Sequence, residues 1–535
     1  MRQIGFKNFR KFENFPVIKL APITLFVGEN NAGKSTVVKG ILALSDFFNR
    51  FDEDRYIFSG ESSLDSMHKK KNLIVSSLKN QKFYFNASYL AHIGTFKRAL
   101  YYKAENNIIS FYTTLDRTDI TIEVFGDRDN EEIVSGYISR IVLDYRMLGL
   151  HIEFDLQKDK AIVTFNPVNV SEDQLDFISP KKRNKAKQFL SSIPHAYELS
   201  FNISNYYRRF VPDLFFLLKA SVEIAISATL ELEKTIKHIG SEVVLELNSI
   251  PNVNNDTIDF LRDYISNICS PYKGEDWMFI LPDSDFLRRY IRIEYLYAHA
   301  VTQTVLYSAK DTNDYLSMTI HEFASRTKTE EDYRKEFIKH WMTEFNIGKD
   351  YIITSVGGEA HLVKIQNNDG EFVNLADKGM GSIQLMVLLF RLAITLPKNT
   401  MKSIKSKKDL KVYTDNARII IIEEPEQNLH PMLQSKLADL FYELNKNYGF
   451  RFIIETHSEY LIRKTQVIVG DNFRNKSIND FENENPFKVY YFPQSGIPYD
   501  MEYTNKGGFK LKFGDGFFNE ASRLNSSVIQ NKLED

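Results

Sequence analysis

Residues 28–36 decide the expected fold, and they read Gly28-Glu29-Asn30-Asn31-Ala32-Gly33-Lys34-Ser35-Thr36. This run matches every position of the pattern G-x-x-x-x-G-K-[S/T]. Apolar residues at 23–27 predict a buried strand before it, and apolar spacing over 35–48 predicts a helix after it. Such a loop wraps backbone N–H groups around a phosphate at the positive end of the helix. A chance glycine-rich turn, the alternative reading, would not need the flanking strand and helix.

The same loop assigns tasks to two side chains. Lys34 is expected to reach the β- and γ-phosphates of a nucleoside triphosphate, and the Ser35 hydroxyl to bind Mg²⁺. We therefore predict a site for a nucleoside triphosphate and Mg²⁺ at this loop.

A second signal is a pair of carboxylates after four isoleucines, 419–422, in the run Glu423-Glu424-Pro425-Glu426. The isoleucines predict a buried strand, whose successive side chains point opposite ways unless the chain turns. We predict that Glu423 lies on the magnesium side and that Glu424 is the general base for the water that attacks the γ-phosphate. The alternative is a solvated acidic loop.

A third signal is His457, which follows the apolar run 452–454. A histidine at the end of a buried strand can donate a hydrogen bond to a γ-phosphate and so report its presence. Taken alone, such a histidine would more often be structural, and its position after a third strand favours the functional reading.

Residues 377–384 read Asp377-Lys378-Gly379-Met380-Gly381-Ser382-Ile383-Gln384, before an apolar run typical of a buried helix. The small residues Gly379, Gly381 and Ser382 would let a helix start present N–H donors to a γ-phosphate. A loop and N-cap before a core helix is the alternative.

Composition bounds the class of protein. The chain has 535 residues and a net charge of −2, from 68 Lys+Arg and 70 Asp+Glu, so no global basic field draws it to nucleic acid or membrane. Its one cysteine, Cys269, cannot form an intramolecular disulfide, which predicts a cytoplasmic protein. The N-terminus does not resemble a signal peptide, and no apolar run reaches the roughly 20 residues of a membrane helix, so we expect no membrane partner.

The pattern of apolar residues predicts five parts along the chain. Alternating segments at 108–112, 120–125, 151–154 and 161–165 predict an antiparallel sheet, and the spacing over 214–226 predicts a long helix. We expect the N-terminal part of a nucleotide-binding head at 1–60, a β-rich lobe at 61–180, a helical insertion at 181–345, the C-terminal part of the head at 346–470 and a small segment at 471–535.

Together, the three motifs in this order resemble the ATP-binding heads of the ABC/SMC class, and within it the bacterial OLD-like and RecF-like AAA ATPases. Asn8-Phe9-Arg10-x-Phe12 resembles the opening N-F-R-x-F of that family, residues 424–431 resemble its carboxylate and D-loop segment, and residues 377–384 take the place of its signature motif. The resemblance implies an α/β P-loop NTPase fold, an ABC-type ATPase head with a mixed sheet, interrupted by a β plus helical insertion.

This resemblance also implies ligands and partners. ATP with Mg²⁺ would bind residues 28–36, with Arg10 among the ATP contacts. In a homodimer or higher oligomer, the signature motif of one subunit would cap the ATP held by another, through Gly379, Gly381, Ser382 and Gln384. Glu423 replaces the usual aspartate and no clear Q-loop glutamine follows the first helix, so we expect slow or partner-dependent hydrolysis.

Two hypotheses about function stay open. The first is an ATP-hydrolysing dimeric switch that acts on DNA or RNA or regulates a separately encoded nuclease in phage defence or DNA repair. OLD-like nucleases carry a toprim domain after the ATPase, whereas only 78 residues follow His457 in this sequence. Residues 294–299 and 307–316 are similar to ATPases of Septu- and retron-type systems. Basic runs at 181–187 and 402–411 would contact nucleic acid or form solvated loops. The second hypothesis is an ATP-dependent assembly module with negligible hydrolysis.

Overall fold

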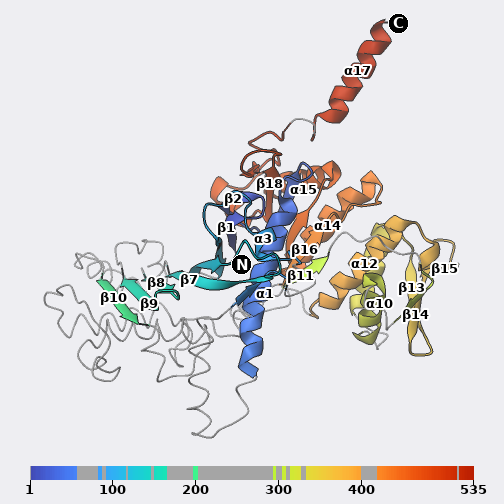
Figure 1. The fold of residues 1–535 in the computed structure, drawn as a ribbon. Coiled ribbons are helices and arrows are strands. Elements are labelled where there is room, and N and C mark those ends of the chain that lie inside the picture. The colour runs from blue at the N-terminus through green and yellow to red at the C-terminus, as the bar shows by residue number, and fades with distance from the viewer. Residues whose placement is uncertain are drawn as a thin grey trace, which may run out of the picture. The chain divides into compact units, whose positions relative to one another are not determined.

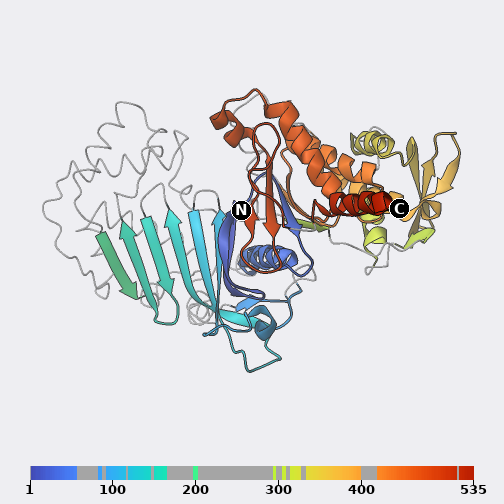
Figure 2. The ribbon, with the colours of Figure 1, turned by 90° about the horizontal axis from the view of Figure 1, so that it is seen from above.

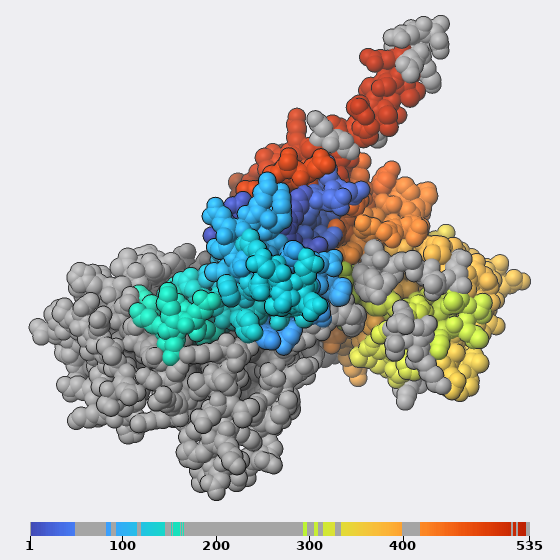
Figure 3. Space-filling view, viewed as in Figure 1, coloured from blue at the N-terminus to red at the C-terminus, as the bar shows by residue number. Residues whose placement is uncertain are grey.

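The computed structural model describes residues 2–56, 82–86, 92–115, 118–145, 150–165, 197–202, 293–296, 304–308, 314–326, 333–398, 418–514 and 517–534. All residues drawn in colour in Figure 3 belong to these ranges. The helix predicted over 214–226 and the basic runs 181–187 and 402–411 lie outside them.

The chain divides into two compact units. The first comprises residues 1–19 and 35–292, and the second residues 20–34 and 293–535. The five ranges expected from the sequence stay predictions. Strand pairing places residues 293–296 in the same sheet as residues 23–28.

An antiparallel sheet of nine strands forms the first unit, with the order β10-β9-β8-β7-β6-β5-β1-β2 and with β4 beside β7. Figure 2 shows its strands side by side. It contains all four segments in which alternation predicted strands. The strands are β1 (Gln3–Phe9), β2 (Phe12–Lys19), β4 (Lys82–Tyr84), β5 (Ile108–Leu115), β6 (Thr118–Phe125), β7 (Ser135–Tyr145), β8 (Leu150–Asp155), β9 (Lys160–Phe165) and β10 (Tyr197–Asn202).

One face of this sheet is aromatic and buried. Phe83 stacks on Phe111 with ring centroids 4.8 Å apart, and Phe9 lies 5.3 Å from Phe111. The helix α1 (Lys34–Tyr56) packs closely there, because a Cβ on Gly40 would lie 2.4 Å from the ring of Phe6. A short helix, α3 (Phe96–Ala99), completes the described helices of this unit.

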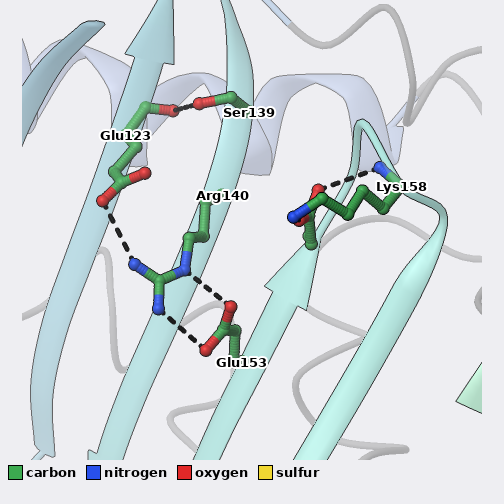
Figure 4. A network of polar contacts seen from close by, with 6 residues as sticks. Glu123, Ser139, Arg140, Glu153 and Lys158 are labelled. Carbon is green, nitrogen blue, oxygen red and sulfur yellow. Dashed lines mark hydrogen bonds and ion pairs between the residues drawn. The ribbon is translucent and has the colours of Figure 1, made fainter. Parts of the chain in front are cut away.

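The opposite face carries charges paired across strands (Figure 4). The Arg140 guanidinium donates to both Glu153 oxygens at 2.7 and 2.8 Å and to Glu123 Oε1 at 3.3 Å. Between the same strands as the Arg140–Glu153 pair, β7 and β8, His151 Nδ1 lies 2.6 Å from Asp144 Oδ1. Opposite charges on neighbouring strands stabilise this register.

The second unit is built on a mixed sheet with the order β11-β16-β17-β3-β18-β19, parallel except for β19. Every residue of β3 is buried, as is typical of a parallel strand covered on both faces. Strands from the two distant parts of the sequence thus share one sheet, which confirms the predicted α/β fold with a mixed sheet. The strands are β3 (Ile23–Gly28), β11 (Ile293–Leu296), β16 (Ile419–Glu423), β17 (Arg451–Glu455), β18 (Phe487–Phe492) and β19 (Tyr499–Asp500).

Helices and a smaller antiparallel sheet complete this unit. Figure 1 shows α10 and α12 beside the smaller sheet, and the two helices also contact each other. The helices are α10 (Tyr315–Arg326), α11 (Tyr333–Glu344), α12 (Met380–Thr395), α14 (Pro431–Tyr448), α15 (Glu459–Phe473), α16 (Ile478–Glu484) and α17 (Glu520–Glu534). The smaller sheet consists of β12 (Leu306–Ser308), β13 (Asp350–Val356), β14 (Ala360–Gln366) and β15 (Phe372–Asn374).

The helix α12 is buried along almost its whole length, as its apolar run predicts. Its one charged residue, Arg391, is 8% exposed. Arg391 Nη1 donates to Glu322 Oε2 at 2.7 Å, and its guanidinium lies 4.6 Å from the ring of Tyr315. The burial of this charge is thus offset by an ion pair and an aromatic face.

Within the ranges described, no helix is both long enough and apolar enough to cross a membrane.

Candidate functional site

Three strands of the second unit end at the same edge of its sheet. In the register, Glu423 of β16 lies beside Glu455 of β17, and Glu455 lies beside Phe26 of β3. Gly28 and His457 each come two residues after the paired residues of their strands. The structure therefore brings the start of the glycine-rich loop, the two carboxylates and the histidine to one edge, as the motif order led us to expect.

The backbone of the loop explains its glycines. Gly28 and Gly33 have φ of 136° and 108°, and Asn31 has φ of 59°. A Cβ on Gly28 would lie only 2.1 Å from the carbonyl oxygen of Phe492 on the neighbouring strand. Glycine is required here by both the dihedral angle and the close approach of β18.

Side chains of the loop divide into buried and exposed ones. Ala32 is 3% exposed, whereas Asn30 and Asn31 are exposed to solvent. The Ala32 N–H donates to the Glu29 carbonyl at 3.3 Å, which closes the turn. The exposed tip therefore carries the side chains, and the buried alanine anchors the loop.

Lys34 is buried at 3% exposure, yet its ammonium is satisfied. Nζ donates to the carbonyl oxygens of Gly28 and Glu29 at 3.1 and 2.8 Å. Both acceptors belong to the loop, so the ammonium lies inside the curve that the loop describes. A buried ammonium with neutral acceptors retains a strong preference for an anion.

Three expected nucleotide contacts belong to the first unit. Ser35 and Thr36 continue into the first turn of α1, where Ser35 is exposed and Thr36 is buried. Arg10 lies in the turn between β1 and β2 with φ of 52°, and its N–H donates to the Ala99 carbonyl at 2.7 Å. Burial, and after it the neighbouring Arg98, lowers the pKa of Arg10. The roles of these three residues stay predictions.

The chain turns at Glu424, which ends the strand alternation after Glu423. Glu424 has φ of 44°, and its N–H donates to the Glu455 carbonyl at 2.7 Å. Its carboxylate accepts a hydrogen bond from Gln427 Nε2. The turn, rather than strand geometry, therefore sets where this carboxylate points, and Gln427 holds it there.

His457 lies within electrostatic reach of both the loop and the carboxylate. Partial desolvation of its imidazole, and after it the charge of Lys34, lowers the pKa of His457, while Glu424 opposes this effect. The residue is exposed to solvent. Lys34 and Glu424 thus act in opposite directions on the pKa of His457.

Sequence reasoning missed a fourth residue, Glu426. It is 8% exposed, and its Oε1 accepts a hydrogen bond from the backbone N–H of His457 at 2.6 Å. Burial raises the pKa of the Glu426 carboxyl, an effect that hydrogen bonding opposes. The signal available was its place after Pro425, but no sequence pattern reveals a contact to residue 457.

The signature segment begins α12, with Gly379 exposed at the N-cap. A Cβ on Gly381 would lie 2.5 Å from the carbonyl oxygen of Asn428, and Asn428 Nδ2 donates to Gln384 Oε1 at 3.2 Å. Ser382 is partly buried, and its N–H donates to the Gly379 carbonyl at 2.9 Å. Gly381 and Gln384 therefore contact the segment that follows Glu424 in the same chain, a contact that the sequence did not indicate.

One known protein aligns with part of this chain. Endonuclease GajA from Bacillus cereus (strain HuB5-5) is 28% identical to this chain over 143 residues, which is 25% of this chain and 19% of GajA. The chain thus aligns with about a fifth of the length of that relative.

Solved SMC head domains are similar at low scores. One from Pyrococcus furiosus, with an extended coiled coil and bound to the C-terminal domain of ScpA, is 12% identical with a TM-score of 0.30, covering 98% of each chain. Another from Thermotoga maritima is 9% identical with a TM-score of 0.30, covering 94% of this chain and 100% of that one.

The family described as AAA ATPase domain matches residues 1–462, which include the glycine-rich loop, both carboxylates and His457. This range is far more than half of the chain. By this match, and in agreement with the expected resemblance, the chain belongs to the AAA ATPase domain family of ATP-binding proteins.

Proposed function

We propose that this chain binds ATP with Mg²⁺ at residues 28–36 and hydrolyses it, with Glu424 as general base. The observation that supports this most is the register of the sheet, in which Glu423, Glu455 and Phe26 lie side by side, so that the glycine-rich loop, the carboxylate turn and His457 follow at one edge. A cation for the phosphates, a carboxylate for water and a neutral hydrogen-bond donor are the groups that phosphoryl transfer to water needs.

Each group has a task that its surroundings support. The Lys34 ammonium exchanges its two carbonyl acceptors for phosphate oxygens, and the Glu424 carboxylate, held by Gln427, orients the water. His457, whose pKa is lowered, is neutral at pH 7 and donates to the γ-phosphate. Bound Mg²⁺ would neutralise charge on the β- and γ-oxygens. Ser35 and Glu423 would supply the oxygen ligands that this ion prefers.

The remaining site residues belong to an ATP-dependent dimer. The signature segment of one subunit caps the ATP of the other through Gly379, Gly381, Ser382 and Gln384. The nucleotide is also contacted within its own subunit, by Arg10, Asn30 and Asn31. An exposed N-cap at Gly379, with nothing within 4 Å of a Cβ built there, supports access by a partner. ATP then holds the dimer together, and its hydrolysis opens it.

A comparison of two variants tests the enzymatic part. Steady-state phosphate release is measured for the wild type and for Glu424→Gln, which keeps the shape and removes the base. Slow release that depends on Glu424 supports hydrolysis, and equal rates favour the assembly module. Calorimetry of Lys34→Ala with ATP and Mg²⁺ tests binding by itself, since this variant is expected to lose the heat that Glu424→Gln retains.

We further propose that the switch acts on DNA or RNA or controls a separately encoded nuclease in phage defence or DNA repair. The partial alignment with an endonuclease supports this direction. Phosphate release with duplex DNA, single-stranded DNA or RNA, each at two salt concentrations, measures the first part. Stimulation that falls with salt and is absent in Glu424→Gln is expected, because backbone contacts are salt-dependent. No stimulation by any nucleic acid favours control of a protein partner.

A further inference from the structure

Glu426 is a buried carboxylate to which the proposed chemistry assigns no task. It lies in the turn between β16 and α14 and is 8% exposed. Its Oε1 accepts the His457 N–H at 2.6 Å, while Oε2 is buried with no hydrogen-bond partner among the described residues. Burial of this carboxyl costs free energy that its hydrogen bonds, to the His457 N–H and the Thr456 side chain among others, offset only in part.

The contact anchors the turn that carries His457. The Thr456 N–H donates to the Phe26 carbonyl of β3 at 3.1 Å, and the Ser458 hydroxyl donates to Gln434 Oε1 of α14 at 2.6 Å. Between these two attachments, the backbone of His457 is held by Glu426. Three consecutive residues are thus fixed to three different segments, and the middle attachment leads to the carboxylate turn.

That turn also contains the proposed general base. The Gln427 N–H donates to the Glu424 carbonyl and the Leu429 N–H to the Glu426 carbonyl, both at 3.1 Å. Glu424 and Glu426 therefore belong to one hydrogen-bonded turn. A displacement of this turn moves the base and the main chain of the histidine together.

We propose that Glu426 is the positioning residue of His457. Its carboxylate fixes the histidine main chain at the sheet edge where the glycine-rich loop and Glu424 also lie, and it couples the imidazole to the base when the γ-phosphate is engaged or lost. This inference rests on the proposed function, because it assigns His457 a task in ATP hydrolysis.

A double-mutant cycle tests the inference. Glu426→Leu removes the acceptor at similar volume, Glu426→Gln keeps an acceptor oxygen, and His457→Ala removes the imidazole. We expect Glu426→Leu to lower kcat about 10- to 100-fold, with the KM for ATP changed by less than about threefold, because misplacement of a reacting group costs rate of this order. Glu426→Gln is expected to remain within about threefold of the wild type, since the N–H keeps its partner.

The combined variant is decisive. If Glu426 acts only through His457, then Glu426→Leu in the His457→Ala background lowers kcat no further. Reductions that multiply would show an independent role and overturn the inference. If the leucine variant does not fold, Glu426→Ser, which leaves the N–H to water, replaces it.

A matched control separates positioning from loss of a buried charge. Glu443 on α14 is partly buried in the same unit, and burial raises the pKa of its carboxyl. Glu443→Gln is expected to leave kcat unchanged.

Failure of the proposed function is distinguishable from failure of the inference. If the wild type shows no phosphate release that depends on Glu424, the same cycle is measured on ATP affinity by calorimetry. Non-additive losses there support the coupling without hydrolysis, and additive losses overturn it.

Discussion

At the scale of single residues, the loop is shaped by backbone demands that only one residue type meets. Gly28 has φ of 136° and faces the Phe492 carbonyl. Gly357 also has a positive φ, 63°, but nothing lies within 4 Å of a Cβ built on it. Alanine substitutions at the two glycines therefore separate the free-energy cost of a positive φ from the cost of a steric clash.

We expect Gly28→Ala to destabilise the protein far more than Gly357→Ala. The second change costs about 1 kcal/mol, the strain of a left-handed residue. The first adds a contact at 2.1 Å that moves β18, and we expect more than about 3 kcal/mol. Urea unfolding of both variants measures the difference, and equal midpoints would contradict the assigned clash.

We expect ATP binding to be accompanied by the uptake of a proton on the His457 imidazole. Desolvation and Lys34 hold its pKa below the usual 6.5, so the folded protein binds fewer protons than the unfolded chain in the window just below that value. This group therefore favours folding above pH 6.5, and its contribution declines as the pH falls through the window. A γ-phosphate beside the ring favours the imidazolium and raises the pKa.

Calorimetry near pH 6 in two buffers of different ionisation enthalpy measures this uptake. We expect up to about one proton per ATP in the wild type and less in His457→Ala. The same uptake in both proteins would place the histidine away from the phosphate.

At the scale of elements, the start of α12 and the carboxylate turn touch within one chain. Gly381 permits the approach, because any side chain there would meet the Asn428 carbonyl at 2.5 Å. Gly379, at the N-cap of the same helix, has open space around it. Packing within the subunit thus explains why residue 381 is small, independently of any contact with a partner subunit.

We expect Gly381→Ala to lower phosphate release at least about tenfold, because it displaces the turn that carries Glu424. Gly357→Ala, where nothing lies within 4 Å of the added Cβ, is the control for the loss of a glycine outside the site and should have a much smaller effect. Equal rates for the two variants would show that the contact does not influence the base.

At the scale of the whole molecule, the expected signature contacts require a second copy of the chain. We expect Glu424→Gln with ATP and Mg²⁺ to elute with twice the 62.3 kDa mass of the monomer, since ATP persists where the base is absent. Light scattering after size exclusion measures this mass. Gly379→Arg, which fills the open space at the N-cap, is expected to remain monomeric. A monomeric mass for Glu424→Gln at saturating ATP would refute the dimer.

Particular segments show which features of the structure could be predicted from the sequence. The glycine-rich loop, the strand of four isoleucines and the strand before His457 were predicted correctly, because each is a local pattern whose burial and spacing need no knowledge of distant residues. The same patterns led to the family and to the α/β fold.

The tertiary structure decided what depends on pairing between distant segments. Three features follow from contacts across long stretches of chain. Residues 293–296 join the sheet that contains the strand before the loop, Glu424 leaves its strand in a left-handed conformation, and Glu426 holds the backbone of His457. Such contacts are chosen by packing and hydrogen bonding in three dimensions, which a one-dimensional pattern does not record. The amino-acid sequence alone indicated the groups that we propose to act on ATP, and the fold decided which neighbours hold them in place.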